Sequence, residues 1–82
     1  MGLERLMHPR DVLSARARSR TAHYRDIQDG LFPKPILVGQ RRTAWPESEV
    51  AAINAARIAR KSDDEIRALV RALERKRERA AG

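Results

Sequence analysis

The chain has 82 residues, no cysteine, and 18 lysines and arginines against 11 aspartates and glutamates, which give a formal net charge of +7. This length allows one small domain and excludes a large enzyme with a deep pocket, so we expect no catalytic activity and no cofactor. The lack of cysteine excludes disulfides and thiolate zinc sites, and two isolated histidines cannot hold a structural metal, so we expect self-association or contact with a partner to support the small core.

The N-terminal segment predicts neither export nor membrane insertion. Residues 1–10 have no apolar core followed by a small-residue cleavage site, unlike a signal peptide. No stretch of the chain approaches the roughly 20 apolar residues of a membrane span. We therefore expect a cytoplasmic protein that does not contact a membrane.

The first expected elements are an N-terminal arm and a short helix. Three apolar residues follow the i, i+3, i+4 spacing of one helix face, and we expect them to cover the core as an arm. These residues are Leu3, Leu6 and Met7. Pro9 suits the first turn of a helix, because its missing N–H group is not needed there. That helix is expected to end at Ala15 and to bury Val12.

A second short helix is expected after a three-residue connection. Ser19 can cap this helix, because its hydroxyl accepts a hydrogen bond from a free N–H group of the first turn. The helix is expected from Arg20 to Asp29, and Gly30 can take the left-handed conformation that ends it. Two short helices joined in this way form a helix-turn-helix pattern.

A β-hairpin is expected next. The proline-rich stretch 32–35 excludes a helix, whereas residues 36–38 have strand character and the chain returns after a turn of about four residues. Arg41 and Arg42 lie at the tip of this hairpin. We expect Trp45 to hold the returning strand on the core.

Two longer helices complete the chain. The third is expected from Pro46 or Glu47 to about Arg60. A capping box of Ser62 and Glu65 begins the fourth, which is expected to run to about Arg79 with a fraying basic end. The fourth helix carries one apolar stripe, formed by Ile66, Leu69, Val70 and Leu73.

The apolar stripe has two interpretations, packing onto its own domain or pairing with another copy. Its four residues are candidates for self-association, and the sequence does not decide between the two interpretations. The chain is accordingly divided into a winged helix-turn-helix domain over residues 1–61 and a C-terminal helix with a basic tail over residues 62–82.

The distribution of charge points to an anionic partner. Residues 1–44 hold nine basic and four acidic side chains, whereas residues 45–82 hold nine and seven. Basic clusters of this kind most often bind nucleic acid, although a solvated basic face is the alternative.

The second helix of a helix-turn-helix lies in the DNA major groove, and a hairpin behind it acts as a wing. The predicted DNA contacts are therefore Ser19, Arg20, Thr21, His23, Tyr24 and Arg25 in the helix, Arg16 and Arg18 in the turn, and Arg41 and Arg42 in the wing. Arginine can bond guanine in a bidentate manner, and the hydroxyl groups can bond bases or phosphates.

Other residues carry less information about chemistry. His23 either reads a base or fills a core position. Asp63, Asp64 and Glu65 are metal ligands by type, but capping and the helix dipole explain them better, so no metal site is predicted. The chain has no Ser-His-Asp arrangement, no paired carboxylates and no Gly-rich phosphate loop.

The order of these features resembles the AlpA family of prophage-type regulators, which are related to excisionase and MerR-like winged helix-turn-helix proteins. The resemblance spans about residues 5–60. Its most specific parts are Gly30–Pro35 and Trp45–Val50, together with Ser19-Arg20-Thr21 and Tyr24-Arg25.

The chain departs from the pattern of that family at two sites. Ala17-Arg18 stands where the turn usually has Gly-Leu, and His23 stands where a branched apolar residue is usual. The loss of the leucine weakens the packing between the two helices and adds a positive charge.

The resemblance implies a mainly α winged helix-turn-helix with a two-stranded wing, an added C-terminal helix and a role in switching the genes of a mobile element or directing an integrase toward excision. We expect a sequence-specific double-stranded DNA-binding protein that acts as a transcriptional regulator, an excisionase-type directionality factor, or both. Integrase or RNA polymerase and a second copy of the chain are its expected partners, and no small-molecule ligand is expected. The alternative is a protein-interaction adaptor that uses the fourth helix and binds DNA only non-specifically.

Overall fold

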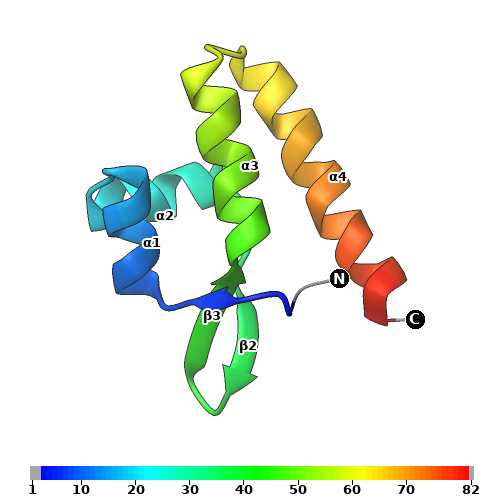
Figure 1. Ribbon diagram of the computed structural model, residues 1–82. Coiled ribbons are helices and arrows are strands. Elements are labelled where there is room, and N and C mark those ends of the chain that lie inside the picture. The colour runs from blue at the N-terminus through cyan, green and yellow to red at the C-terminus, as the bar shows by residue number, and fades with distance from the viewer. Residues whose placement is uncertain (1–2, 82) are drawn as a thin grey trace.

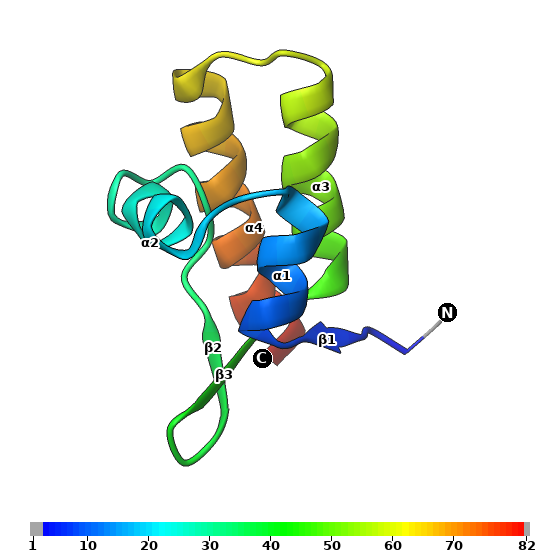
Figure 2. The same ribbon diagram turned by 90° about the vertical axis from the view of Figure 1, so that its left-hand side faces the viewer.

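The structure is a computed structural model that describes residues 3–81. Over these residues it contains four helices and a small antiparallel sheet of three strands, in the order β1-β3-β2 (Figures 1 and 2). The elements in chain order are β1 (Leu6–Met7), α1 (Pro9–Arg16), α2 (Arg20–Gln28), β2 (Ile36–Gly39), β3 (Arg42–Pro46), α3 (Glu47–Ile58) and α4 (Asp63–Ala81). Helices α1 and α2 form the helix-turn-helix, β2 and β3 form the wing, and α4 is the added helix. This confirms the predicted mainly α fold.

Local capping signals set most of the element boundaries. The Ser19 hydroxyl accepts a hydrogen bond from the N–H group of Ala22 at 3.2 Å and so caps α2. Gly30 follows α2 with φ +77°. At the start of α4, the Ser62 hydroxyl accepts from the Glu65 N–H group at 3.2 Å, and the Glu65 carboxylate accepts from the Ser62 N–H group at 3.0 Å. All three signals were predicted, because each depends on residues within four positions of one another.

The turn between α1 and α2 forms without a glycine. Ala17 adopts the left-handed conformation (φ 53°, ψ 44°), and the N–H groups of Ala17 and Arg18 donate to the last carbonyl groups of α1. An L-residue in this conformation costs about 1–2 kcal/mol, which glycine would avoid. The departure at Ala17 therefore costs stability but leaves the turn geometry in place.

The N-terminal arm differs from the prediction. Residues 6–7 form β1, in which Leu6 lies opposite Pro46 and Met7 opposite Trp45. Leu3 is 96% exposed and Leu6 is 49% exposed, so these two leucines do not cover the core, whereas Met7 packs against it. In an extended strand successive side chains point to opposite faces, so the helical spacing of the three residues has no structural meaning here.

The core lies between α1, α3, α4 and the base of the hairpin. Its fully buried large side chains include Trp45, Phe32, Ile53 and Ile66. The Trp45 indole N–H donates to the carbonyl oxygen of Pro33 at 2.8 Å, which satisfies its one polar atom inside the core. Trp45 therefore fixes the returning strand to the core, as predicted.

Helix α4 is longer than predicted and its second half is held in place. The Arg77 guanidinium donates to the Glu49 carboxylate at 2.8 Å and to the Lys34 carbonyl oxygen at 2.8 Å. The Lys34 N–H group donates to the Glu74 carboxylate at 2.9 Å. These contacts bind α4 to the start of α3 and to the segment before β2. None of the helices over residues 3–81 has the length and the apolar character that a membrane crossing requires.

Candidate nucleic-acid interface

Helix α2 has one buried face and one exposed face. His23 and Asp26 are buried at 0% and 3% exposure. The predicted contact residues on the other face are exposed, namely Ser19, Arg20, Thr21, Tyr24 and Arg25. The guanidinium carbon of Arg20 lies 5.6 Å from the centre of the Tyr24 ring, a cation–π distance that orders two of these side chains. The exposed face thus offers two cations, two aliphatic hydroxyls and a phenol to a partner.

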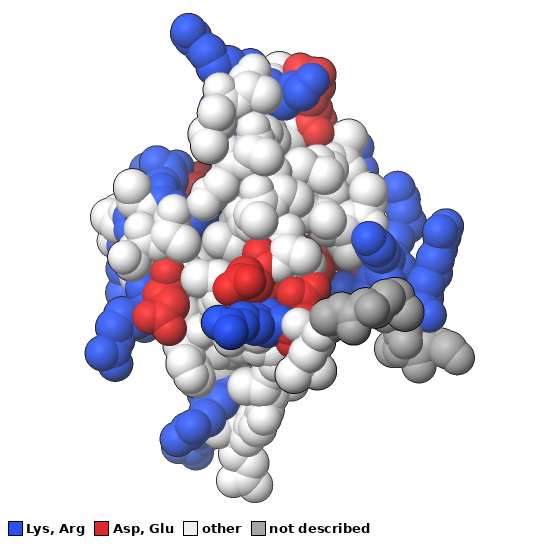
Figure 3. Space-filling view, in the orientation of Figure 1, with Lys and Arg blue, Asp and Glu red and all other residues white. Residues whose placement is uncertain are grey.

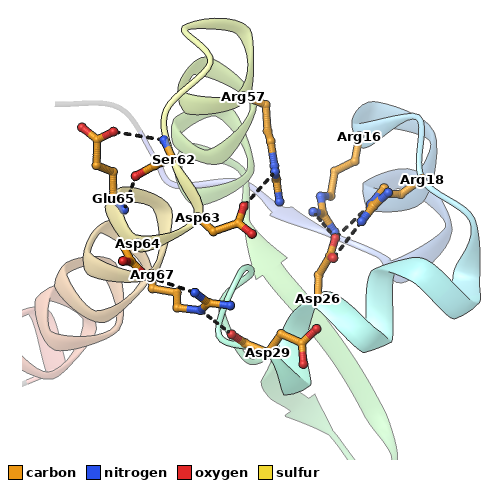
Figure 4. Close-up of polar contacts among 10 residues, drawn as sticks. All are labelled: Arg16, Arg18, Asp26, Asp29, Arg57, Ser62, Asp63, Asp64, Glu65 and Arg67. Carbon is orange, nitrogen blue, oxygen red and sulfur yellow. Dashed lines mark hydrogen bonds and ion pairs between the residues drawn. The ribbon is translucent and has the colours of Figure 1, made fainter.

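An ion-pair network fixes the orientation of α2 relative to α1. The Asp26 carboxylate accepts from the Arg16 guanidinium at 2.8 Å and from two nitrogens of Arg18 at 2.9 and 2.7 Å (Figure 4). Asp26 lies on α2, whereas Arg16 ends α1 and Arg18 lies in the turn. The network therefore joins all three parts of the helix-turn-helix.

The network also changes the roles predicted for its arginines. The Arg16 side chain is 3% exposed, so the prediction that it contacts DNA is wrong. Its guanidinium lies 4.0 Å from the centre of the Phe32 ring and packs against this core side chain. The Arg18 side chain is 41% exposed and can still reach a partner from its free side.

Burial and charge shift the pKa values within this network. Burial acts to raise the pKa of Asp26, but hydrogen bonds from Arg18 and Arg16 outweigh it and hold that pKa below its ordinary value. Burial lowers the pKa of Arg16 despite its bond to Asp26. The hydrogen bond to Asp26 raises the pKa of Arg18. Asp26 is therefore a carboxylate at neutral pH, between two cations.

His23 is a core residue, and the prediction that it reads a base is wrong. Its ring packs against Tyr24, Phe32 and Trp45 at centroid distances of 4.9–5.1 Å. Nδ1 accepts a hydrogen bond from Arg16 at 2.7 Å, while Nε2 is buried without a partner. Burial, and next the charge of Arg16, lower the pKa of His23 to about 4. The neutral ring fills the position where a branched apolar residue was expected from the family pattern.

The wing presents its two arginines to solvent. Arg41 and Arg42 are both exposed, and Arg41 occupies the left-handed region with φ 62°, which closes the turn between β2 and β3. No carboxylate among residues 3–81 forms an ion pair with either side chain. The hairpin projects from the body of the molecule beside α1 (Figure 1). The wing tip is therefore free to bind an anionic partner.

The apolar stripe of α4 belongs to the core of this chain. Ile66 is 0% exposed and Val70 4% exposed, and Leu69 and Leu73 pack against the same cluster. Of the two interpretations that the sequence left open, the structure supports packing onto the chain's own domain, so these four residues are not candidates for self-association. The spacing of a stripe shows which face is buried but not which surface buries it.

Two residues of α3 lie near the turn between α1 and α2, and their positions were not predicted from the sequence. Asn54 and Arg57 of α3 line a recess of about 320 Å³ together with residues 16–18. The Asn54 amide donates to the Ala15 carbonyl oxygen at 3.0 Å, and Arg57 lies 3.9 Å from the Asp63 carboxylate. Arg18 and Arg57 are the cations of this recess that reach the surface, and their side chains are 41% and 40% exposed. No local sequence pattern predicts that α3 lies against the turn, because the two segments are almost 40 positions apart in the chain.

Of the three acidic residues at the start of α4, Glu65 completes the predicted capping box (Figure 4). Asp63 and Asp64 form ion pairs that were not predicted, with Arg57 and Arg67 respectively. Over the residues that the structure describes, no group of three or more His, Cys, Asp or Glu side chains is arranged to hold a metal ion.

The comparison with protein families identifies the group to which this chain is related. Residues 5–57, more than half of the chain, match the family described as prophage CP4-57 regulatory protein (AlpA). The chain belongs to the AlpA family. The matched region contains the whole helix-turn-helix, the wing and most of α3.

A protein of a bacteriophage is also similar to this AlpA-family chain. The uncharacterized protein ORF88 of Enterobacteria phage P4 is 38% identical over 56 residues, which are 68% of this chain and 64% of the phage protein. The chain therefore spans a little under two thirds of the length of that relative. No solved structure matched the chain.

Proposed function

We propose that this AlpA-family protein binds specific sites on double-stranded DNA and acts as a transcriptional regulator of a mobile element, as an excisionase-type directionality factor, or as both. In this proposal the recognition helix is α2, and Arg20, Thr21 and Arg25 face the base edges of the major groove. Ser19, Tyr24 and Arg18 contact phosphates beside it. Arg41 and Arg42 of the wing contact the backbone or the minor groove.

The observation that carries the proposal is the division of α2 into two faces. Its buried face is tied to α1 by Asp26, and its exposed face carries cations and hydroxyls that point to solvent. A recognition helix needs this arrangement, since the helix must be held rigidly while its outer side chains enter a groove. The free arginines of the wing add charge on a second element. We place the protein in the cytoplasm, where DNA and a polymerase or integrase partner are accessible.

The adaptor alternative has less support than the sequence suggested. An adaptor that binds another protein through α4 would use an exposed apolar surface on this helix. The large apolar residues of the α4 stripe pack into the core instead. Self-association on DNA remains part of the proposal for the excision role, but it would use surfaces other than this stripe.

The test is selection of bound duplexes from a random pool at near-physiological salt. We expect one enriched motif with the natural chain. With Arg20→Ala, the motif should lose preference at particular base positions, at about 1–3 kcal/mol per lost contact. The matched control is Lys61→Ala, which removes an exposed cation from the connection between α3 and α4 and should leave the motif unchanged.

The wing is tested by the salt dependence of binding. Arg41→Ala and Arg42→Ala should weaken binding to all sequences alike, and each lost phosphate contact should reduce the slope of log K against log salt by about one unit. No enriched motif, or a motif that Arg20→Ala leaves intact, would contradict the proposal for α2. An isolated or palindromic motif favours a regulator, whereas short motifs repeated in phase favour head-to-tail assembly in excision.

A further inference from the structure

The outer face of α4 carries a row of arginines that the proposed function does not use. Arg71, Arg75 and Arg79 are each four positions apart, so they lie above one another on one side of the helix, and all three are exposed. With a rise of about 1.5 Å per residue, neighbouring members stand about 6 Å apart along the axis. We call these three residues the α4 arginine row.

The row is not explained by ion pairs within the molecule. Among the described residues, no carboxylate lies within ion-pair distance of any of its members. Glu74, one turn away, accepts a hydrogen bond from the backbone of Lys34. Glu78 is exposed beside the row and offsets only part of its charge.

The row is not explained by helix stability either. Like charges at i, i+4 destabilise a helix, and the row contains two such pairs in succession. The helix dipole favours a cation in the last turn, which accounts for Arg79 but not for the two members nearer the middle. Arg71 with Glu74 and Arg75 with Glu78 form i, i+3 pairs of opposite charge that offset this repulsion, so helix stability neither requires the row nor forbids it. The exposed guanidinium groups are available to a partner that supplies the opposite charge.

The second half of α4, which holds Arg75 and Arg79, lies away from the helix-turn-helix, whereas Arg71 lines a recess beside the end of α2. In Figure 1, α4 and α1 stand on opposite sides of α3, and in Figure 2 α4 lies behind α1 and α2. Figure 3 shows Lys and Arg atoms gathered along the edge where the second half of α4 lies, apart from the Lys and Arg atoms beside the hairpin.

We propose that the α4 arginine row binds the phosphate backbone of a second DNA segment, so that one protein molecule bridges two duplexes. This rests on the proposed function for the first duplex, which α2 and the wing bind. The row would bind any sequence, because charges spaced along a helix axis recognise backbone and not base edges.

The side chains around the row favour a nucleic-acid backbone over other anionic partners. Residues 68 and 72 on the same face are alanines, so the surface offers no aromatic or large apolar anchor of the kind that protein interfaces use. An interfacial membrane helix likewise needs an apolar face to insert, and the apolar stripe of α4 is buried in the core. A phosphate backbone needs only the charge.

The experiment measures capture of a second duplex. A biotinylated duplex with the selected motif is held on beads, the full-length protein is added, and a fluorescent duplex of scrambled sequence is supplied. We expect the natural chain to retain the fluorescent duplex. The variant Arg71→Gln/Arg75→Gln/Arg79→Gln should lose at least ten-fold in retained fluorescence, while its affinity for the first duplex stays within two-fold.

Folding and total charge are controlled separately. Glutamine is a good helix former, so the melting temperature of the variant should equal or exceed that of the natural chain. The charge-matched control is Arg5→Gln/Arg10→Gln/Lys61→Gln, which removes three exposed cations outside the row and should keep the bridging. Equal loss in the control, bridging by the variant, or no bridging by the natural chain would each overturn the proposal.

A second measurement separates failure of the row from failure of the proposed function. In Arg20→Ala/Arg25→Ala/Arg41→Ala/Arg42→Ala, a residual duplex binding should remain, and adding the three changes of the row should reduce its salt slope by about 3 units. If α2 and the wing do not bind DNA, this residual binding persists alone and the row is still supported. If the row does not affect it, the row is excluded whatever α2 does. Binding of the natural chain to anionic vesicles that depends on the row, without row-dependent duplex binding, would likewise exclude the DNA interpretation.

Discussion

Acidification should destabilise this protein through His23. The pKa of His23 is about 4 in the folded chain, because burial and the charge of Arg16 oppose protonation, against 6.5 for an ordinary histidine. Between these two values the unfolded chain binds a proton that the folded chain does not. Stability is therefore complete above about pH 6.5 and falls as the pH decreases toward 4.

The size of this effect follows from the two pKa values. Integrating the proton uptake from pH 7 to pH 5 gives a loss of about 2 kcal/mol. For a domain of this length that loss lowers the melting temperature by about 8–16 °C. It is a large fraction of the stability expected for so small a core, about 3–5 kcal/mol.

The assay is urea unfolding followed by circular dichroism at several values between pH 7 and pH 5. The control variant is His23→Leu, which puts a branched apolar side chain in the same buried position. It loses the hydrogen bond from Arg16, so its stability at pH 7 can fall, but its stability should change little between pH 7 and pH 5. His8→Gln, at an exposed position, should keep the pH dependence of the natural chain.

Two results would refute the reasoning about His23. One is a natural chain whose stability is the same at pH 7 and pH 5. The other is a His23→Leu variant that loses as much stability on acidification as the natural chain. An imidazole NMR signal of His23 that titrates near pH 6.5 in the folded protein would contradict the lowered pKa directly.

Three further perturbations test the contacts that hold the site and α4 in place. Asp26→Ala should cost about 3–5 kcal/mol in urea unfolding, because it leaves a buried guanidinium without its counter-ion; a loss below 1 kcal/mol would show that the network is not stabilising. Arg77→Ala should lower the free energy of unfolding by about 1–3 kcal/mol, because it leaves the buried Glu49 unpaired. Amide exchange should rise in the second half of α4, while α1 and α2 stay protected. Ile66→Ala should lower the free energy of unfolding by about 2–5 kcal/mol and leave the association state unchanged. The control Ile58→Ala, at a position 83% exposed, should change stability by less than about 0.5 kcal/mol. Equal effects of the two changes would contradict the assignment of the α4 stripe to the core.

The boundaries of the elements could be predicted because their causes are local. The Ser19 cap, the left-handed Gly30 and the box of Ser62 and Glu65 each involve residues within four positions, and the structure contains all of them. The hairpin and the burial of Trp45 also followed from composition and spacing. The resemblance to the AlpA family predicted the same fold, and it depended on many of the same residues.

The sequence-based predictions were wrong or undecided for residues that can occupy two different environments. Contacts with distant parts of the chain decide which environment such a residue occupies. The pattern left His23 open between a base contact and the core, and the aromatic cluster with Phe32 and Trp45 places it in the core. Arg16 resembled one more cation of a basic cluster, but it pairs with Asp26, ten positions away. In the same way, Leu3, Leu6 and Met7 have the spacing of a helix face, but Leu6 and Met7 pair with β3 as a strand.

By itself, the sequence determined the order of the elements, the basic character of the surface and the membership of a helix-turn-helix family. Tertiary structure alone decided which charges are neutralised and which remain available. Asp26 pairs with Arg16 at the end of α1 and with Arg18 in the turn, and Glu49 pairs with Arg77, 28 positions along the chain. The cations of α2, the wing and the α4 arginine row stay exposed. The physical reason is that an ion pair depends on the distance between two side chains in space, and spacing along the sequence sets that distance only within one helix or one turn.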